Sequence, residues 1–195
     1  MTAPAWVFLR QFVTSPRSVG AILPSSAALA ATMVAPIDFA TGPTIVEFGP
    51  GTGAFTRAIA QRLRPPGRYL GIELNAAFCE TLAAEFPTQT FVHGSVADLT
   101  TILADHGIGR VDAIVCGLPW ASLPIALQER VFDEIERALV PGGVFMTFAY
   151  LHGLLLPGAS ALRRRLARSF ADVSHSPIVW GNVPPAFAYI CRTRS

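Results

Sequence analysis

The middle of the chain alternates short apolar runs with longer amphipathic stretches. Buried strands of a parallel sheet form short, nearly continuous apolar runs, whereas the helices that cover the sheet repeat their apolar positions every three to four residues. The apolar runs predict strands at residues 44–48, 68–73, 90–92, 111–116 and 144–150. The stretches between them predict helices at about 54–63, 76–85, 99–106 and 124–139. Repeated strand–helix units favour a parallel sheet with helices on both faces.

Two segments lie outside this repeating core. Near the N-terminus, bulky residues that include Trp6, Phe8 and Phe12 share one face of a predicted amphipathic helix, and a turn at residues 20–26 carries serines suited to cap the next helix. Near the C-terminus, residues 173–180 and 186–191 predict two strands that form an antiparallel hairpin at the sheet edge. The expected fold is therefore an α/β, Rossmann-like, seven-stranded and mostly parallel sheet. We expect one domain at 41–195, preceded by an amphipathic helical segment at 1–40 that acts as a lid or a membrane contact.

Residues 159–170 predict a basic amphipathic helix. Leu162, Leu166 and Phe170 form an apolar stripe, and the segment contains no acid. It carries four arginines: Arg163, Arg164, Arg165 and Arg168. A helix of this kind is typical of a membrane surface or a partner contact, although an ordinary solvated helix on the sheet would have the same pattern. On the first interpretation, these arginines and the N-terminal aromatic residues contact an anionic membrane surface.

The strongest chemical signal is the glycine-rich turn after the first strand. Residues 47–53 read Glu-Phe-Gly-Pro-Gly-Thr-Gly and lead directly into a helix. Gly49, Gly51 and Gly53 let the backbone turn tightly and approach a ligand with no Cβ in the way. The carboxylate of Glu47 would repel a pyrophosphate at this helix N-terminus, but it suits a ligand that carries an ammonium and a sulfonium. S-adenosylmethionine (SAM) is therefore favoured over NAD.

A second acid strengthens this interpretation. Glu73 ends the second predicted strand, twenty residues after Gly53. A carboxylate at that place can accept hydrogen bonds from both ribose hydroxyls of a nucleoside. A tight strand–helix turn without a ligand is the alternative, and the two acids together make it the less favoured one.

Composition narrows the chemistry further. All fifteen basic residues are arginine, so the chain has no lysine for a Schiff base or a P-loop. The cysteines Cys79, Cys116 and Cys191 are far apart, and the four histidines form no ligand pattern, so we expect no metal site. The net charge of +2 gives no reason to expect nucleic acid as a partner. No apolar run is long enough for a transmembrane helix, and no secretory signal is evident.

The acceptor side of the site is predicted at the end of the fourth strand. Residues 116–120 read Cys-Gly-Leu-Pro-Trp, and in SAM-dependent enzymes this position faces the transferred methyl group. Gly117 offers no side-chain acceptor, which disfavours a planar nucleobase amine and favours an aliphatic amine on a flexible substrate. Trp120 either holds an ammonium by cation–π contact or packs the pocket wall. An ammonium must lose a proton before it attacks, and Tyr150, His152, Glu47 or water could accept it.

At this point the motifs resemble the bacterial phospholipid N-methyltransferase family, which is similar to the rRNA adenine dimethylases in its core. The resemblance covers nearly the whole chain and rests on residues 20–26, 47–53, 71–75, 117–120 and 182–187. It implies SAM as cofactor and stepwise methylation of phosphatidylethanolamine towards phosphatidylcholine, or of a related amino lipid. It also implies a cytoplasmic enzyme that associates peripherally with the inner face of the cell membrane.

The resemblance further implies a role for each matching residue. The methionine part of SAM would lie against Glu47, Gly49, Gly51 and Gly53, the ribose against Glu73, and the adenine against Ser95 and Val96. Gly117 would border the cofactor, and the substrate would lie against Leu118, Trp120 and Asn182.

Two alternative functions remain open from the sequence. One is a methyltransferase for another amino lipid, an RNA adenine or a small-molecule amine. RNA would require a broad positive face or a basic appended domain, and the chain has only one short arginine-rich helix. The other is a protein that binds SAM and lipid without catalysis, because the sequence does not single out the base.

Overall fold

A computed structural model describes residues 25–120, 123–155 and 157–195 of the chain. One seven-stranded sheet, in the order β3-β2-β1-β4-β5-β7-β6, forms its centre. The strands are β1 (Thr44–Phe48), β2 (Arg68–Glu73), β3 (Thr90–His93), β4 (Val111–Cys116), β5 (Leu139–Tyr150), β6 (Asp172–His175) and β7 (Ala186–Arg192). The first five pair in parallel, whereas β7 runs antiparallel to both β5 and β6. The predicted Rossmann-like sheet with a C-terminal antiparallel pair is therefore confirmed.

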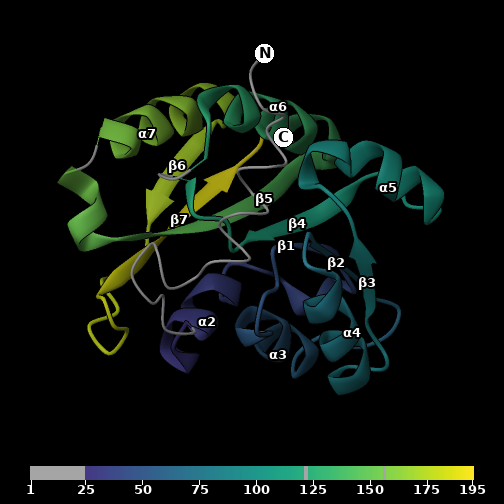
Figure 1. Cartoon of the computed structure of the whole chain (residues 1–195). Helices are drawn as coiled ribbons and strands as arrows, with labels where there is room; N and C mark the ends of the chain where they lie inside the picture. The colour runs from purple at the N-terminus through teal and green to yellow at the C-terminus, as the bar shows by residue number, and fades with distance from the viewer. Residues whose placement is uncertain (1–24, 121–122, 156) are drawn as a thin grey trace, which may run out of the picture.

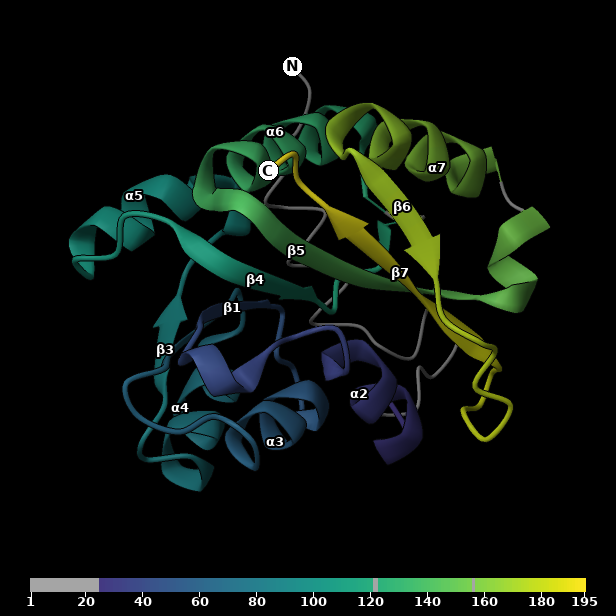
Figure 2. The ribbon, with the colours of Figure 1, turned by 180° about the vertical axis from the view of Figure 1, so that it is seen from behind.

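Helices cover both faces of the sheet (Figure 1). One face carries α2 (Ala27–Val34), α3 (Ala54–Ala60) and α4 (Ala76–Glu85), and the other carries α5 (Leu99–Asp105), α6 (Ile125–Ala138) and α7 (Pro157–Ser169). Short 3-10 turns lie at η1 (Phe39–Thr41), η2 (Val96–Asp98) and η4 (Leu151–Leu155). A view from behind shows the same two layers of helices with the sheet between them (Figure 2). Each layer closes its own apolar core against one side of the sheet.

The helix α2 belongs to the packed core. The hydroxyl of Ser26 caps it by accepting a hydrogen bond from the amide of Leu29 at 3.1 Å, as the serine-containing turn predicted. Leu29 and Met33 are fully buried in the same cluster as Ile45 of β1. The core thus includes part of the segment 1–40, and the lid or membrane role given to that segment stays a prediction. The predicted amphipathic helix with Trp6, Phe8 and Phe12 lies outside the described residues.

The strand β5 differs from its prediction. It begins at Leu139 rather than at residue 144, because Leu139 pairs with Val111 while Val144 pairs with Ala113. The residues between them form a bulge in which Gly142 has a φ of +74°. The sequence Val-Pro-Gly-Gly therefore interrupts a strand, whereas we expected it to separate a helix from one. The predicted helix at 54–63 is also shorter, ending at Ala60.

Candidate active site at the carboxyl ends of the strands

The glycine-rich turn after β1 has the backbone that its sequence predicts. Gly49, Gly51 and Gly53 have φ values of +62°, +56° and +79°, which side chains other than glycine rarely adopt. The amide of Gly49 donates to the carbonyl of Ile72 at 2.9 Å, and that of Gly53 donates to the carbonyl of Pro50 at 2.9 Å. A Cβ built on Gly51 would have no neighbour closer than 3.9 Å. The turn thus leaves open space beside the backbone of Gly51, at the carboxyl end of β1.

The carboxylate of Glu73 is fixed against this turn. Its Oε2 accepts a hydrogen bond from the amide of Gly51 at 3.0 Å, and its Oε1 accepts one from the amide of Asn75 at 2.9 Å. The side-chain oxygen of Asn75 in turn caps α4 through the amide of Ala77. The end of β2 therefore holds an oriented carboxylate beside the glycine-rich backbone, as the spacing predicted.

Glu47 is fully buried, and only one of its oxygens has partners. Its Oε2 accepts hydrogen bonds from the hydroxyls of Tyr69 at 2.7 Å and Thr56 at 2.8 Å, whereas Oε1 has no partner among the described residues. Burial raises the pKa of Glu47 from 4.5 to about 7, although both hydrogen bonds lower it. A buried carboxyl oxygen without a partner is costly, and it would be satisfied by a bound cationic group.

Tyr69 and Thr56 hold Glu47, and the sequence reasoning missed both. Gly71 pairs with Glu47 across the strands and makes room for the tyrosine ring. A Cβ built on Gly71 would lie 2.8 Å from the Tyr69 hydroxyl oxygen. A glycine inside a buried strand marks such a close approach, so this was the signal available in the sequence.

The turn after β4 packs directly on the turn after β1. The amide of Gly117 donates to the carbonyl of Phe48 at 2.8 Å, and a Cβ at Gly117 would lie 2.8 Å from the carbonyl oxygen of Gly49. Leu118 is nearly buried, and its side chain reaches Gly49 as well. Residues 117–118 and the glycine-rich turn therefore lie together, although they are far apart in the sequence.

The segment after β3 lies next to Glu73. The amide of Gly94 donates to the carbonyl of Glu73 at 3.0 Å, and Ser95 follows as the cap of η2, accepting from the amide of Ala97 at 3.2 Å. Val96 is buried in the core. The predicted ribose and adenine segments are therefore neighbours, and the Ser95 hydroxyl is already used as a helix cap.

Trp120 packs in the core. Its ring is 3 % exposed and stacks on Phe132 with centroids 4.7 Å apart, and its Nε1 donates to the hydroxyl of Thr147 at 2.9 Å. The edge of Phe145 closes the arrangement. Of the two interpretations left open by the sequence, cation–π contact or packing, the structure contradicts the first and supports packing, because the indole is covered by these neighbours.

Tyr150, the last residue of β5, and His152, which follows it in η4, lie together. Their rings are stacked with centroids 5.6 Å apart, and the edge of Phe148 packs on Tyr150. The Tyr150 hydroxyl is buried and has no hydrogen-bond partner in the described part of the chain, whereas the His152 side chain is exposed. Burial raises the pKa of Tyr150, so its phenol stays protonated near neutral pH and can donate a hydrogen bond.

Asn182 is buried, and its side chain joins two backbone segments by hydrogen bonds. Its Oδ1 accepts a hydrogen bond from the amide of Ser26 at 2.9 Å, and its Nδ2 donates to the carbonyl of Pro184 at 2.7 Å. These bonds tie the loop before β7 to the start of α2. Substrate contact by Asn182 would have to use its remaining amide hydrogen.

Comparison with known proteins places this geometry in a family. The methyltransferase domain family matches residues 45–143, about half of the chain. The chain is 33% identical over 190 residues to an ornithine lipid N-methyltransferase of Singulisphaera acidiphila, covering 96% of this chain and 95% of that protein. This protein is a class I SAM-dependent methyltransferase. SAM is accordingly its cofactor, as the glycine-rich turn and the two acids predicted.

Solved structures share the methyltransferase fold. The N-methyltransferase NodS from Bradyrhizobium japonicum WM9 superposes with a TM-score of 0.66 at 15% identity, over 97% of this chain and 98% of that one. The O-methyltransferase TomG from Streptomyces achromogenes, in complex with SAM, does so with a TM-score of 0.66 at 18% identity, over 99% and 91% of the two chains. Identities this low establish the fold alone.

The basic helix α7 of the methyltransferase divides its arginines into two groups. Leu162, Leu166 and Phe170 are buried as predicted. Arg165 was expected to contact a membrane, but its guanidinium lies within 3.4 Å of carboxylates of Glu129, Asp133 and Glu136 on α6. It also lies over the ring of Phe132, 5.1 Å from the centroid. This arginine joins two helices, which corrects its predicted role.

The other arginines of α7 remain at the surface. Arg163 and Arg164 are exposed, and Arg168 is exposed with one long contact of 3.9 Å to Glu129. A basic face on this helix is therefore present, but it is smaller than the sequence suggested. No described helix of the methyltransferase is long and apolar enough to cross a membrane.

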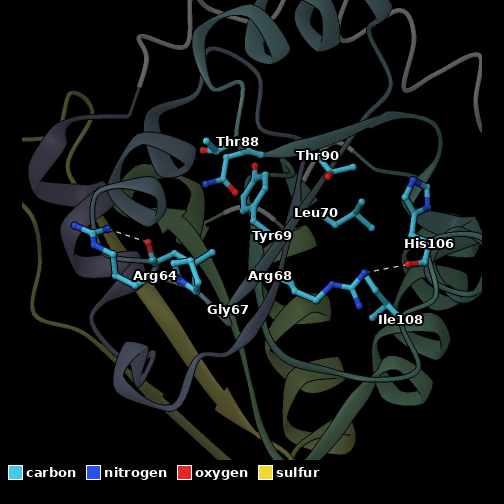
Figure 3. Close-up of a pocket in the computed structure, with 12 residues that line it drawn as sticks. Arg64, Gly67, Arg68, Tyr69, Leu70, Thr88, Thr90, His106 and Ile108 are labelled. Atoms are coloured by element: carbon cyan, nitrogen blue, oxygen red, sulfur yellow. Dashed lines mark hydrogen bonds between the residues drawn. The ribbon is translucent and has the colours of Figure 1, made fainter.

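A separate cavity of about 420 Å³ lies at the opposite edge of the sheet, at the amino ends of β2 and β3 (Figure 3). Its arginines are bound to backbone carbonyls: Arg68 donates to that of His106 at 3.0 Å, and Arg64 donates to that of Leu63 at 2.8 Å. The cavity faces away from the glycine-rich turn, so it is not part of the candidate active site. Among the described residues, no cluster of histidine, cysteine or acidic side chains could hold a metal ion.

Proposed function

We propose that this methyltransferase transfers the methyl group of SAM to the primary amine of a membrane lipid. The observation that carries the proposal is the similarity, over nearly the whole length of both chains, to an ornithine lipid N-methyltransferase. The glycine at position 117 supports it, because a flexible aliphatic amine needs no planar side-chain acceptor there. An ornithine lipid is the first candidate substrate. Phosphatidylethanolamine and its methylated intermediates on the way to phosphatidylcholine are the second.

The residues at the carboxyl ends of the strands fit the cofactor. The unpartnered Oε1 of Glu47 would accept from the ammonium of the methionine part, beside the backbone of Gly49, Gly51 and Gly53. The Glu73 carboxylate would accept from the ribose hydroxyls, and the segment Ser95–Val96 would border the adenine. When bound, SAM would supply a methyl group on a sulfonium, so that an uncharged amine can attack the methyl carbon in line while the sulfur leaves as a neutral thioether. Gly117 and Leu118 would border that path and exclude water.

Two side chains are proposed to prepare the amine. His152 is exposed next to Tyr150 and would take the ammonium proton at an imidazole nitrogen, the commonest general base in enzymes. The Tyr150 hydroxyl, which has no partner among the described residues, would orient the same amine or an ester oxygen of the lipid by donating a hydrogen bond. The stacked rings would keep the two groups together.

The proposal also places the protein on the inner face of the cell membrane. Arg163, Arg164 and Arg168 of α7 would attract an anionic surface, each by about 1 kcal/mol. The N-terminal aromatic residues Trp6, Phe8 and Phe12 are proposed to add apolar contacts. Charge reversal of the three arginines should weaken vesicle binding most at low salt. Arg165 is left unchanged in that variant, because it binds α6.

The test of the function is transfer of radiolabelled methyl from SAM into vesicles that contain ornithine lipid, phosphatidylethanolamine or neither, with chromatographic separation of the lipids. We expect label in ornithine lipid. Label only in phosphatidylethanolamine would select the second substrate. No label with either lipid, together with intact SAM binding, would reject the lipid proposal and leave another amine or a non-catalytic binding protein. Glu47→Gln should abolish transfer, while the matched variant Glu80→Gln on the exposed side of α4 should not.

A further inference from the structure

The loop between β6 and β7, residues 176–185, lies on the rim of the candidate active site, and we call it the rim loop. It ends where Ala186 pairs with Tyr150, the last residue of β5. Because β5 runs parallel to β4, this is the edge of the sheet that carries the glycine-rich turn and Gly117. Neighbouring strands are about 4.8 Å apart and each residue advances about 3.3 Å, so the start of β7, two strands across and three residues further along, is about 14 Å from the end of β4. The loop projects from the body of the protein in both views (Figures 1 and 2).

The tip of the rim loop is apolar and exposed. Trp180 is 70% exposed, Val183 is 63% exposed and Ile178 is 38% exposed. The chain carries no charged residue from Ser176 to Cys191. Three large apolar side chains in one short loop, with no charge among them, are unusual at a surface that faces only water.

The exposure is imposed by the way the loop is built. The amide of Val179 donates to the carbonyl of Ala186 at 2.7 Å, and the amide of Asn182 donates to the carbonyl of Val179 at 3.2 Å. The buried side chain of Asn182 ties the loop to the amide of Ser26 and to the carbonyl of Pro184. Polar bonds thus hold the inner side of the loop, while Trp180 and Val183 point away from the core.

We propose that the rim loop inserts Trp180 and Val183 into the lipid bilayer and so brings the active site to its substrate. This inference rests on the proposed lipid substrate. Tryptophan favours the boundary between head groups and acyl chains, because its ring is apolar and its N–H can still bond to water or lipid. The charge-free loop can enter that boundary without burying a charge. A lipid amine at the surface would then lie beside Tyr150 and Gly117, and the lipid would not need to leave the membrane.

The proposal is tested with the full chain and vesicles of phosphatidylcholine and phosphatidylglycerol at roughly four to one. We expect the double variant Trp180→Ala, Val183→Ser to bind vesicles about tenfold more weakly. Each large apolar side chain that moves from water into the bilayer contributes favourably to the free energy of binding. The loss should persist at high salt, because apolar insertion is not screened. The control is Val173→Ala on β6, which trims a less exposed apolar side chain, 36% exposed, away from the tip and should bind as the wild type does.

Two further measurements separate this inference from the proposed function. Methyl transfer to a short-chain amino lipid dissolved as monomers should be the same in the wild type and in the double variant, and so should SAM affinity. If the wild type methylates no amino lipid at all, the proposed function fails, whereas the vesicle result still decides the rim loop. Unchanged vesicle binding in the double variant would overturn the inference. Unchanged binding together with a dimer that dissociates in the variant would assign the loop to contact between two copies of the chain.

Discussion

Replacing Glu47 by glutamine should remove a pH-dependent loss of stability from the folded protein. Burial raises the pKa of Glu47 from 4.5 to about 7, and the hydrogen bonds from Tyr69 and Thr56 offset only part of that effect. Because the folded-state pKa lies above that of the unfolded chain, the folded protein binds more protons between these two pH values. The stability contributed by this group is therefore fully present below about pH 4.5, and it is lost as the pH rises through about 7.

The size of the effect follows from the same two values. The difference between 4.5 and about 7, at about 1.36 kcal/mol for each pKa unit, corresponds to about 3 kcal/mol. A domain of this size is stable by about 5–15 kcal/mol, so this loss would be a large part of the total. Retaining the carboxylate at that cost is consistent with a group kept for binding a cation.

The assay is urea unfolding without SAM at pH 5 and pH 8, followed by circular dichroism. Glu47→Gln keeps an oxygen that can accept from Tyr69 and Thr56, and it cannot titrate. We expect the wild type to lose about 2–3 kcal/mol more than the variant between the two pH values, because a small part of the effect is already lost at pH 5 and the other groups contribute equally to both proteins. Equal losses in both proteins would refute the reasoning. Glu80→Gln, an exposed control, should behave as the wild type does.

Three other predictions follow from the same contacts. If SAM needs the Glu47 carboxylate, its affinity, measured by isothermal titration, should be about tenfold weaker at pH 6 than at pH 8, and it should not vary in this way in Glu47→Gln. Arg165→Ala should lower the free energy of unfolding, measured in urea, by about 2 kcal/mol, because it leaves a cluster of carboxylates uncompensated. Arg168→Ala should lower it by less than about 0.5 kcal/mol, so similar losses in the two variants would contradict this prediction. Gly117→Ala should lower both the melting temperature and the affinity for SAM, since its Cβ would collide with the Gly49 carbonyl oxygen. If neither value changes, the backbone of the turn can shift to accommodate the methyl group.

Much of the cofactor side could be predicted from local sequence. The turn after β1 needs positive φ at Gly49, Gly51 and Gly53, which glycine adopts without strain, so the motif and the backbone agree. Glu73 was placed correctly at the end of β2, because the apolar run that precedes it predicts that strand with its observed bounds. Periodicity likewise placed β1, β2 and β4 with their observed ends.

The acceptor side depended on contacts between distant segments. Trp120 could have faced a substrate, but Phe132 and Thr147, from two other elements, bury it. Arg165 has the same sequence neighbours as a membrane-facing arginine, and only the approach of α6 turns it inward. A sequence pattern specifies which face of a helix or strand a residue occupies. It does not specify which other element packs against that face.

The sequence by itself determined the Rossmann-like sheet, its order of strands and helices, the glycine-rich turn and the two acids near it. These features depend on backbone conformation and on periodicity within single elements, which neighbouring residues control. The tertiary structure decided which side chains are free to act. Long-range packing leaves Oε1 of Glu47 and the Tyr150 hydroxyl without partners among the described residues, occupies Trp120, Asn182 and Arg165, and holds Trp180 outward on the rim loop. The choice of partner arises only when elements far apart in the chain meet, and no local pattern encodes it.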